Sequence, residues 1–317
     1  FPPSDPRERS GTLADIPFDR QFEPSHGKAV EVAPGVRRLT APNAGPYTFH
    51  GTNTYILGRG SVAVIDPGPD DPAHLAALLA ATKGEAISQI ILTHTHRDHS
   101  DGVAALAAAT GAATAGQPHR TSRALHAGEA NLLDASSDTA FHPDVMLADG
   151  DRIDGEGWQL EVVATPGHAA NHLAFALDGH DLLFSGDHVM AWSTSIVAPP
   201  DGAMADYMAS LARLLDRPER RYLPGHGGPV VSAHGFVRSL MAHRRMREAA
   251  ILDRLAKGDR TIAEIVAALY RETPAALHGA AALSVFAHME DAVARGLVAS
   301  DGVPRLDGTF GPATAAR

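Results

Sequence analysis

The feature that most constrains the fold of this chain is the run His94-Thr95-His96-Arg97-Asp98-His99, which follows the apolar stretch QIILT (89–93). A continuous apolar stretch of this length predicts a strand that is buried on both faces of a sheet. His94 and His96 lie two residues apart and point to one side of an extended segment, whereas Asp98 and His99 can turn toward a neighbouring point. Imidazole and carboxylate ligands suit zinc, iron or manganese. The run therefore predicts a loop that serves two cations, rather than an ordinary polar surface loop.

Three further turns each present one candidate ligand at the end of a predicted strand. Taken singly, a histidine or an aspartate beside a glycine is usually just a turn residue. Together, and in one order along the chain, the turns indicate ligands that a layered α/β fold gathers at the C-terminal ends of its strands. The ligands are His168 in TPGH (165–168), Asp187 in SGD (185–187) and His226 in LPGHG (223–227).

The chain has no cysteine, so disulfides are excluded and any metal must be held by His, Asp or Glu. Its formal net charge of −10 argues against a general polyanion binder, because a negative field repels phosphate backbones. No apolar run approaches the roughly 20 residues of a membrane helix, and the first residues lack the pattern of a signal peptide. We therefore expect no membrane association and a cytoplasmic location.

Strands, helices and turns alternate through residues 31–244, which is typical of one α/β domain. Asp71 followed by Pro72 predicts a helix start, with Asp71 as the N-cap and proline at the first helical position. The residues before this domain are rich in proline, charges and turn formers. They predict an irregular N-terminal arm at 1–30.

A change in composition near the end of that domain predicts a second module. A long helix is expected at 236–257, and Thr261 followed by Glu264 is the capping-box arrangement that starts another helix. A third helix is predicted at about 280–296, and the tail LVASDGVPRLDG is typical of a small hairpin. Three helices and a wing indicate a winged-helix-like domain, which we place at 245–317.

The series H-x-H-x-D-H, P-G-H, G-D and P-G-H-G resembles the motif order of the metallo-β-lactamase superfamily over about residues 30 to 235. The resemblance implies an α/β fold, an αββα metallo-β-lactamase sandwich with the site at one edge. Asp66 in VIDPG matches the family's early aspartate, which supports the ligand loop; the alternative is an ordinary strand-ending turn residue. The implied ligands are His94, His96 and His168 for one metal, and Asp98, His99 and His226 for the second, with Asp187 bridging the two.

Four segments resemble a branch of this superfamily that adds a C-terminal winged-helix-like α+β domain. That branch includes lactamase-beta-like protein 2, an endoribonuclease that acts on single-stranded RNA. The resemblance makes the last of the segments the helix that joins the two domains. The segments are GTNTYI (51–56), SGDHVM (185–190), DYMASL (206–211) and HRRMREAAIL (243–252).

The resemblance implies a binuclear, zinc-dependent hydrolase with two divalent metal ions, taken as Zn²⁺ with Mn²⁺ or Fe as alternatives. Two such cations can share a water and lower its pKa toward neutrality, which provides a metal-bridging hydroxide for attack. Asp98 would orient that hydroxide and is the expected catalytic residue. Asn53 and His243 are candidates for substrate contact, with a core or solvent-facing role as the alternative for each. His188 is expected to be a hydrogen-bonded structural histidine.

The sequence leaves several substrates open for such a site. One is single-stranded RNA guided by basic residues on the predicted connecting helix, although a solvated helix face is the simpler interpretation. A small ester or thioester, as for glyoxalase-type thioesterases, and a phosphodiester are others. A mono-iron dioxygenase on the same scaffold and a metal-responsive regulator are the non-hydrolytic alternatives. The basic residues are Arg238, His243, Arg244, Arg245 and Arg247.

The C-terminal module does not have the composition of a DNA reader. Between Arg245 and Arg317, nine Lys/Arg residues balance nine Asp/Glu residues, so the module is neutral. The third helix carries one arginine against a glutamate and an aspartate, whereas a DNA-reading helix normally carries several basic or amide side chains. We therefore expect no sequence-specific DNA partner. A lid, a wall of the substrate site or a homodimer surface is a better use of the module.

Overall fold

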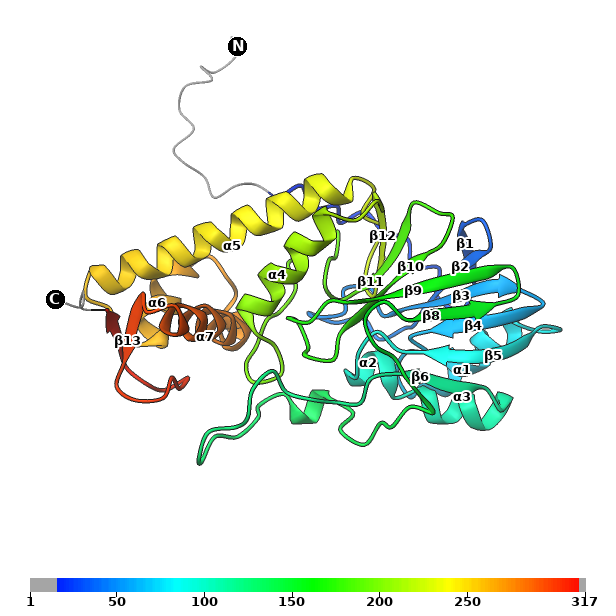
Figure 1. Ribbon diagram of the computed structural model, residues 1–317, viewed down its shortest axis with the longest axis horizontal. Helices are drawn as coiled ribbons and strands as arrows, with labels where there is room; N and C mark the ends of the chain where they lie inside the picture. Colours follow the sequence, from blue (N-terminus) through cyan, green and yellow to red (C-terminus); the bar gives the residue numbers. More distant parts are fainter. Residues whose placement is uncertain (1–15, 314–317) are drawn as a thin grey trace, which may run out of the picture.

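Two β-sheets lie face to face with helices on their outer sides, and a smaller module follows at the end of the chain (Figure 1). The structure is a computed structural model that describes residues 16–313. The first half of the predicted N-terminal arm, residues 1–15, lies outside the described residues. Residues 16–29 contain neither helix nor strand, and the extent of the arm stays a prediction.

The first sheet has seven strands that follow one another in chain order. Its first four strands pair antiparallel and its last four pair parallel. Parallel pairing of β4 and β5 requires a crossover, which helix α1 (Pro72–Ala81) supplies. The strands are β1 (Val30–Ala33), β2 (Val36–Thr40), β3 (Asn53–Arg59), β4 (Ser61–Ile65), β5 (Ala86–Ile91), β6 (Ala113–Gly116) and β7 (Val145–Met146).

The second sheet has five strands in the order β12-β11-β10-β9-β8. Its strands pair antiparallel except for β11 and β12, which are parallel and are joined through helix α4 (Met204–Leu215). Their bounds are Arg152–Gly155 for β8, Trp158–Ala164 for β9, Leu173–Leu177 for β10, Leu182–Gly186 for β11 and Arg221–Pro224 for β12.

Three apolar layers hold the sandwich together, and single strands contribute to two of them. In β3, Tyr55 and Leu57 point into the layer between the sheets, whereas Ile56 points to the layer under α1 and helix α3 (Val103–Thr110). A third layer lies between the second sheet and α4, where Tyr207 and Leu211 are fully buried. The alternation follows from the two-residue period of a strand, and it confirms the predicted αββα arrangement.

The C-terminal module has a core of its own beneath a long helix. The 24-residue helix α5 runs without a break from the second sheet into this module, as Figure 1 shows in yellow. Residue 245 lies inside α5, so the division of the chain at that residue stays a prediction. The elements are α5 (Ala233–Ala256), α6 (Ile262–Leu269), α7 (His278–Ala294), β13 (Val298–Ser300) and β14 (Phe310–Pro312), with a single 3-10 turn at Ala275–Leu277; a similar turn at Asp134–Ser136 lies between β6 and β7 of the sandwich.

Several local predictions are confirmed. Asp71 caps α1 by accepting hydrogen bonds from the backbone N–H groups of Ala73 and His74. Thr261 and Glu264 form the predicted capping box at the start of α6. The tail forms the expected antiparallel pair of strands, β13 and β14. Within residues 16–313, no helix is both long enough and apolar enough to cross a membrane.

Candidate metal centre

The candidate ligands lie on four loops at one end of the two facing sheets. The first loop leaves β5 in an extended conformation through His94 and His96, and then turns into the short helix α2 (Arg97–Ser100). This change from extended to helical backbone lets Asp98 and His99 face a different point from His94 and His96. The other three ligands follow the ends of β9, β11 and β12; they are His168, Asp187 and His226.

Three histidines form the first group. The Nδ1 atom of His96 lies 2.9 Å from the Nε2 atom of His94 and 2.9 Å from the Nε2 atom of His168. The three ring nitrogens fall within 4.8 Å of one another, which is the spacing that ligands of one cation require.

Asp98, His99 and His226 form the second group. The Nε2 atom of His226 lies 3.2 Å from Asp98 Oδ2, and the Nε2 atom of His99 lies 3.5 Å from the same oxygen. Asp187 faces both groups, because its Oδ2 atom lies 3.3 Å from His226 Nε2 and 3.7 Å from His168 Nε2. This is the position that a carboxylate shared by two cations would occupy.

Each of three ligand histidines turns its other ring nitrogen to an oxygen behind it. His99 Nδ1 lies 3.0 Å from Asp66 Oδ2, His168 Nδ1 lies 2.7 Å from the carbonyl oxygen of Ile196, and His226 Nδ1 lies 3.2 Å from that of Gly51. An acceptor at the far nitrogen fixes the tautomer and aims the near nitrogen at the cluster. Asp66 thus contacts the ligand set from behind, as the resemblance implies.

Gly225 shows how tightly the backbone is packed around the ligands. A Cβ atom at this position would lie 2.5 Å from Asp187 Oδ1 and 2.6 Å from Cε1 of His99. The glycine in the P-G-H-G turn is therefore needed for the close approach of β12 to the second ligand group.

Burial keeps His94 and His96 neutral. It lowers the pKa of His94 well below its usual range, and the neighbouring histidines lower it further. Burial, together with His168, lowers the pKa of His96 to about 3. Neutral imidazole is the form that binds a metal, so these two side chains need not lose a proton first.

In the second group, the neighbouring carboxylates outweigh burial and raise the pKa values of the histidines. Burial alone would lower the pKa of His226, but Asp187 and Asp98 raise it to about 9. Burial also lowers the pKa of His99. The negative charges of Asp98, Asp187 and Asp66 have a larger effect in the opposite direction, so this pKa lies well above its usual range. In turn His99 and His226 hold the pKa of both carboxyls, Asp98 and Asp187, low against the effect of burial. The carboxylates thus create a negative field that suits cations.

The donor set fits divalent metal ions. His99 Nε2 and Asp187 Oδ1 are buried and have no hydrogen bond, since the 3.5 Å between them is too long to satisfy either atom. Buried polar atoms without a partner are rare in folded proteins, and a bound cation would satisfy both of these atoms. The groups that could each hold an ion are His94–His96–His168, His94–His99–Asp187 and Asp98–His99–His226.

Asn53 is fully buried and has no free polar atom for a substrate. Its side-chain N–H group donates to the carbonyl oxygens of Pro224 and Gly227 at 3.0 and 2.9 Å, and its oxygen accepts from Thr40. These bonds hold the turn that carries His226. The contacts therefore favour support of the ligand turn over substrate contact.

His188 differs from the prediction. It is fully buried beside Asp187, but neither of its ring nitrogens has a hydrogen bond, so the expectation of a hydrogen-bonded histidine is wrong. Its ring packs on the ring of Tyr207 with 4.7 Å between centroids. His243, the other candidate substrate contact, lies half-buried on α5.

Sequence reasoning missed two supports of the ligand set. His172 binds the backbone N–H of Asp187 through its Nε2 atom at 3.1 Å, and its Nδ1 atom lies 2.8 Å from Thr165 Oγ1. Ile196 contributes only a carbonyl oxygen, to His168. A contact through a backbone carbonyl cannot be predicted from the residue type, because every residue has one. His172, in contrast, could have been considered from the sequence, because it is a histidine four residues after His168.

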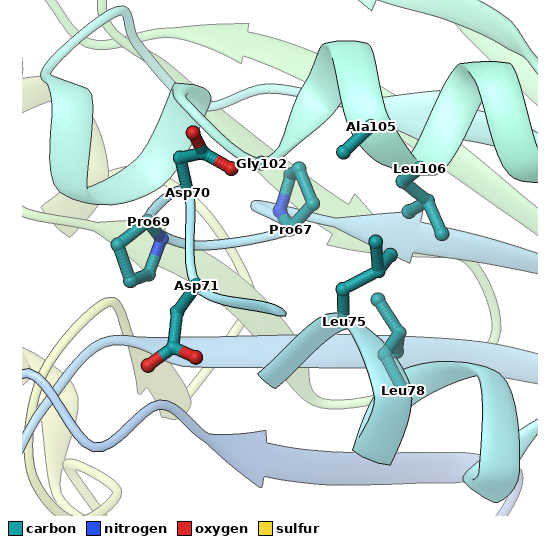
Figure 2. Close-up of a pocket in the computed structure, with 9 residues that line it drawn as sticks. All are labelled: Pro67, Pro69, Asp70, Asp71, Leu75, Leu78, Gly102, Ala105 and Leu106. Carbon is teal, nitrogen blue, oxygen red and sulfur yellow. The ribbon is translucent and has the colours of Figure 1, made fainter. Parts of the chain in front are cut away.

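A separate hollow lies on the other side of the turn that follows β4. Figure 2 shows its apolar side chains on one side and two carboxylates on the other. None of its lining residues is a candidate metal ligand. They are Pro67, Pro69, Asp70, Asp71, Leu75, Leu78, Gly102, Ala105 and Leu106.

Two family descriptions match the chain. Residues 47–226 match the metallo-beta-lactamase superfamily, and residues 261–305 match the beta-lactamase associated winged helix domain. The beta-lactamase-like protein 2 homolog of Drosophila melanogaster is 32% identical over 275 residues, which are 81% of this chain and 89% of that protein. An atrochrysone carboxyl ACP thioesterase of Aspergillus fumigatus is 30% identical over 262 residues, 77% of this chain and 76% of that one.

Solved structures share the fold at lower identity. A beta-lactamase domain protein from Burkholderia ambifaria superimposes with a TM-score of 0.77 at 21% identity, covering 93% of this chain and 96% of its own. A metallo-beta-lactamase family protein from Thermus thermophilus has a TM-score of 0.72 at 23% identity, covering 89% and 100%. These likenesses extend over both the sandwich and the C-terminal module.

Proposed function

Because this chain belongs to the metallo-beta-lactamase superfamily and carries the winged helix domain associated with it, we propose that it is a binuclear metal-dependent hydrolase of small ester or thioester substrates. The superfamily's members are typically hydrolases, and this chain has candidate ligands for divalent metals. The number and identity of the metals and the substrate class belong to the proposal. We take the metals to be Zn²⁺.

One observation carries the proposal, namely the position of Asp187 between two ligand groups. A single structural cation needs four closed ligands, whereas seven candidate ligands with a shared carboxylate suit two cations with positions left for water and substrate. A regulator without catalysis would not need such a set. The seven are His94, His96, Asp98, His99, His168, Asp187 and His226.

When bound, divalent cations at this site would supply Lewis acidity that lowers the pKa of a water and stabilises negative charge on the substrate oxygen. Asp98 has the best position among the carboxylates to receive the proton of that water. Its side chain is partly exposed, unlike that of Asp187, and Thr52 Oγ1 donates to its Oδ2 atom at 3.3 Å. Asp66, behind His99, keeps that ring oriented during the reaction.

Two observations support esters and thioesters as the substrates, namely the names of similar proteins and the exposure of the basic residues on α5. Relatives at 28 to 30% identity include two proteins named atrochrysone carboxyl ACP thioesterase. The basic residues of α5 do not form one exposed track for RNA, because Arg238 and Arg245 are exposed whereas Arg244 is only 4% exposed. A phosphodiester or an RNA chain is the alternative substrate.

The first experiment is a substrate panel with purified, metal-loaded protein. We expect hydrolysis of acyl thioesters and nitrophenyl esters, and elemental analysis should find about two zinc ions per chain. Cleavage of single-stranded RNA or of a nitrophenyl phosphodiester without any thioester hydrolysis would overturn the choice of substrate. A single iron with consumption of oxygen would instead point to a dioxygenase and contradict the hydrolase.

A further inference from the structure

Four basic side chains meet between α5 and α7, near the candidate metal centre. Three of them come from one side of α5, where His243 and Arg247 are one helical turn apart and Arg244 is next to His243. The fourth, His288, comes from α7 and is only 2% exposed. We name the set of His243, Arg244, Arg247 and His288 the basic cluster.

Five nitrogen atoms of the basic cluster are buried and have no hydrogen-bond partner. His243 Nδ1, Arg244 Nε, Arg247 Nε and both ring nitrogens of His288 have no hydrogen bond. A buried donor or acceptor nitrogen without a partner destabilises a fold by about 1–3 kcal/mol, so native structures rarely leave several together. The basic cluster concentrates five such atoms in one place.

No carboxylate compensates the two arginines. Across residues 16–313, neither Arg244 nor Arg247 forms an ion pair with an aspartate or a glutamate. Arg244 donates to the carbonyl oxygen of Ser195 and to Ser284 Oγ, and its guanidinium lies 5.2 Å from the Tyr207 ring. The guanidinium of Arg247 lies 4.5 Å from the ring of Tyr270.

The electrostatic field at this place is positive. Burial, followed by Arg244 and Arg247, lowers the pKa of His243 to about 4 and that of His288 to about 3. The charges that act on these two rings are all positive. Both histidines are therefore neutral near pH 7, while the two arginines keep their charge.

The basic cluster adjoins the metal centre through two short routes. Arg244 donates to the carbonyl oxygen of Ser195, and the next carbonyl along the chain, that of Ile196, holds His168. On the other route, the Tyr207 ring lies between Arg244 and His188, which directly follows Asp187. Arg244 is therefore separated from the ligand set by only one or two residues along each route.

We propose that His243, Arg244 and Arg247, with His288 behind them, bind a carboxylate or phosphate group of the substrate. The assignment of that group to the substrate rests on the proposed function. An oxyanion accepts several hydrogen bonds at once and neutralises buried guanidinium groups, which a water molecule does not. His243 and Arg247 are only half-buried, so they give the group a way in from solvent.

Matched pairs of thioesters test this proposal. One pair is the glutaryl and pentanoyl thioesters of N-acetylcysteamine, which differ by a terminal carboxylate. The other is pentanoyl phosphopantetheine and pentanoyl pantetheine, which differ by a phosphate. We expect the metal-loaded protein to have a kcat/KM about tenfold or more higher for the charged member of one pair, because a charge-assisted hydrogen bond is worth that much.

Variants of α5 show whether the preference comes from the basic cluster. Arg247→Gln should reduce the charged-over-uncharged ratio by about tenfold, and Arg247→Lys should keep part of it. Arg245→Gln is the matched control, because Arg245 lies on the same helix and is exposed. The proposal is overturned if the wild type prefers neither charged member, or if the two glutamine variants lower the ratio equally.

Binding of inorganic phosphate to the chelated full-length protein separates this proposal from the proposed function. We expect phosphate to raise the Tm of the wild type and of Arg245→Gln, but not that of Arg247→Gln. If this holds while every thioester is inert, the hydrolase proposal fails and the oxyanion site stands. If phosphate leaves Tm unchanged while both members of each pair are hydrolysed equally, the oxyanion site fails and the hydrolase stands. If phosphate binds but the protein hydrolyses the charged and uncharged thioesters equally well, the site holds a free anion, which contradicts the assignment of the bound group to the substrate.

Discussion

Asp66 shows how a single residue outside the ligand set can control it. Its backbone has a φ of +51°, in the left-handed region that residues with side chains rarely adopt. In that conformation its carboxylate accepts from the backbone N–H of Thr93 at 2.8 Å, from Thr93 Oγ1 at 2.7 Å and from His99. The strained turn thus ties the strand end to a ligand ring.

Replacing Asp66 by asparagine should weaken metal binding rather than folding. The variant keeps the shape of the side chain but removes the charge opposite His99 Nδ1. We expect metal affinity to fall by about ten- to a hundredfold, as for other supports of a ligand histidine. Competition with a chromogenic chelator measures the change. Asp71→Asn, which alters the cap of α1, is the control, and an equal loss of affinity in both variants would contradict the assignment.

Asp98 lies next to His99 on the loop that follows β5, and it is expected to act on the reaction itself. Asp98→Ala should lower kcat by at least about a hundredfold, because it removes both a ligand and the acceptor for the proton of water. The far-UV spectrum should stay unchanged. Asp70→Ala removes an exposed carboxylate from a neighbouring loop and should keep its activity. Wild-type turnover in Asp98→Ala would contradict the catalytic assignment.

At the scale of single elements, the capping box of α6 is a local device with a measurable effect. Thr261 Oγ1 accepts from the N–H of Glu264, and the Glu264 carboxylate accepts from the N–H of Thr261 at 3.0 Å. Thr261→Ala should destabilise the C-terminal module by about 1 kcal/mol. The loss of stability is measured by urea unfolding, with hydrogen exchange of the α6 amides as the readout. Thr261→Ser keeps the acceptor and should restore stability; a serine variant as weak as the alanine variant would argue against the cap.

Helix α5 is the element that carries the structure from the sandwich to the C-terminal module. Arg245→Pro would remove one helical hydrogen bond near its middle and place the ring against the preceding turn, which costs about 3 kcal/mol or more. We expect a large loss of stability and of activity together, because α5 also carries Arg244. Arg245→Ala, at the same exposed position, should stay within about 0.5 kcal/mol of the wild type. Equal stability of the two variants would show that α5 need not be continuous.

At the scale of the whole molecule, Arg123 joins the sandwich to α7. Its guanidinium forms two 2.7 Å bonds to Glu129 and contacts Glu290 of α7 at 2.6 Å. Hydrogen bonds from Arg123 lower the pKa of Glu129 to about 2. Because this pKa is lower in the folded protein than the value of about 4.5 in the unfolded chain, ionised Glu129 stabilises the fold at pH values above about 4.5. This stabilisation is lost as the pH falls toward 2.

The contact therefore predicts that the difference in stability between the wild type and Glu129→Gln depends on pH. Glu129→Gln should be less stable than the wild type by about 1 kcal/mol at pH 7, and the gap should close between about pH 5 and pH 2. Urea unfolding at a series of pH values measures it. Glu272→Gln, at an exposed position of the C-terminal module, should show no such gap. A gap for Glu129→Gln that stays constant through this range would refute the prediction.

How much of this was predictable depends on the range over which each interaction acts. The cap of α1, the capping box of α6 and the strand before His94 depend on neighbours a few residues apart, so sequence patterns predict them. The resemblance of the ligand motifs to the metallo-β-lactamase superfamily also implied the sandwich. Support of His168 by the carbonyl of Ile196, 28 residues away, was invisible because any residue type provides a carbonyl.

By itself the sequence determined the elements, the sandwich and the residue types that metals require at the loop after β5. The tertiary structure decided which of those residues meet, because Asp187 and His226 reach the loop only when the second sheet packs on the first. It also showed that basic residues of α5 with the same charge have different surroundings. Arg245 faces solvent, while Arg244 is buried without a carboxylate, since the helix turns one toward water and the other toward α7 and the metal centre. Sequence spacing predicts which residues share a helix face, but only packing decides what covers that face.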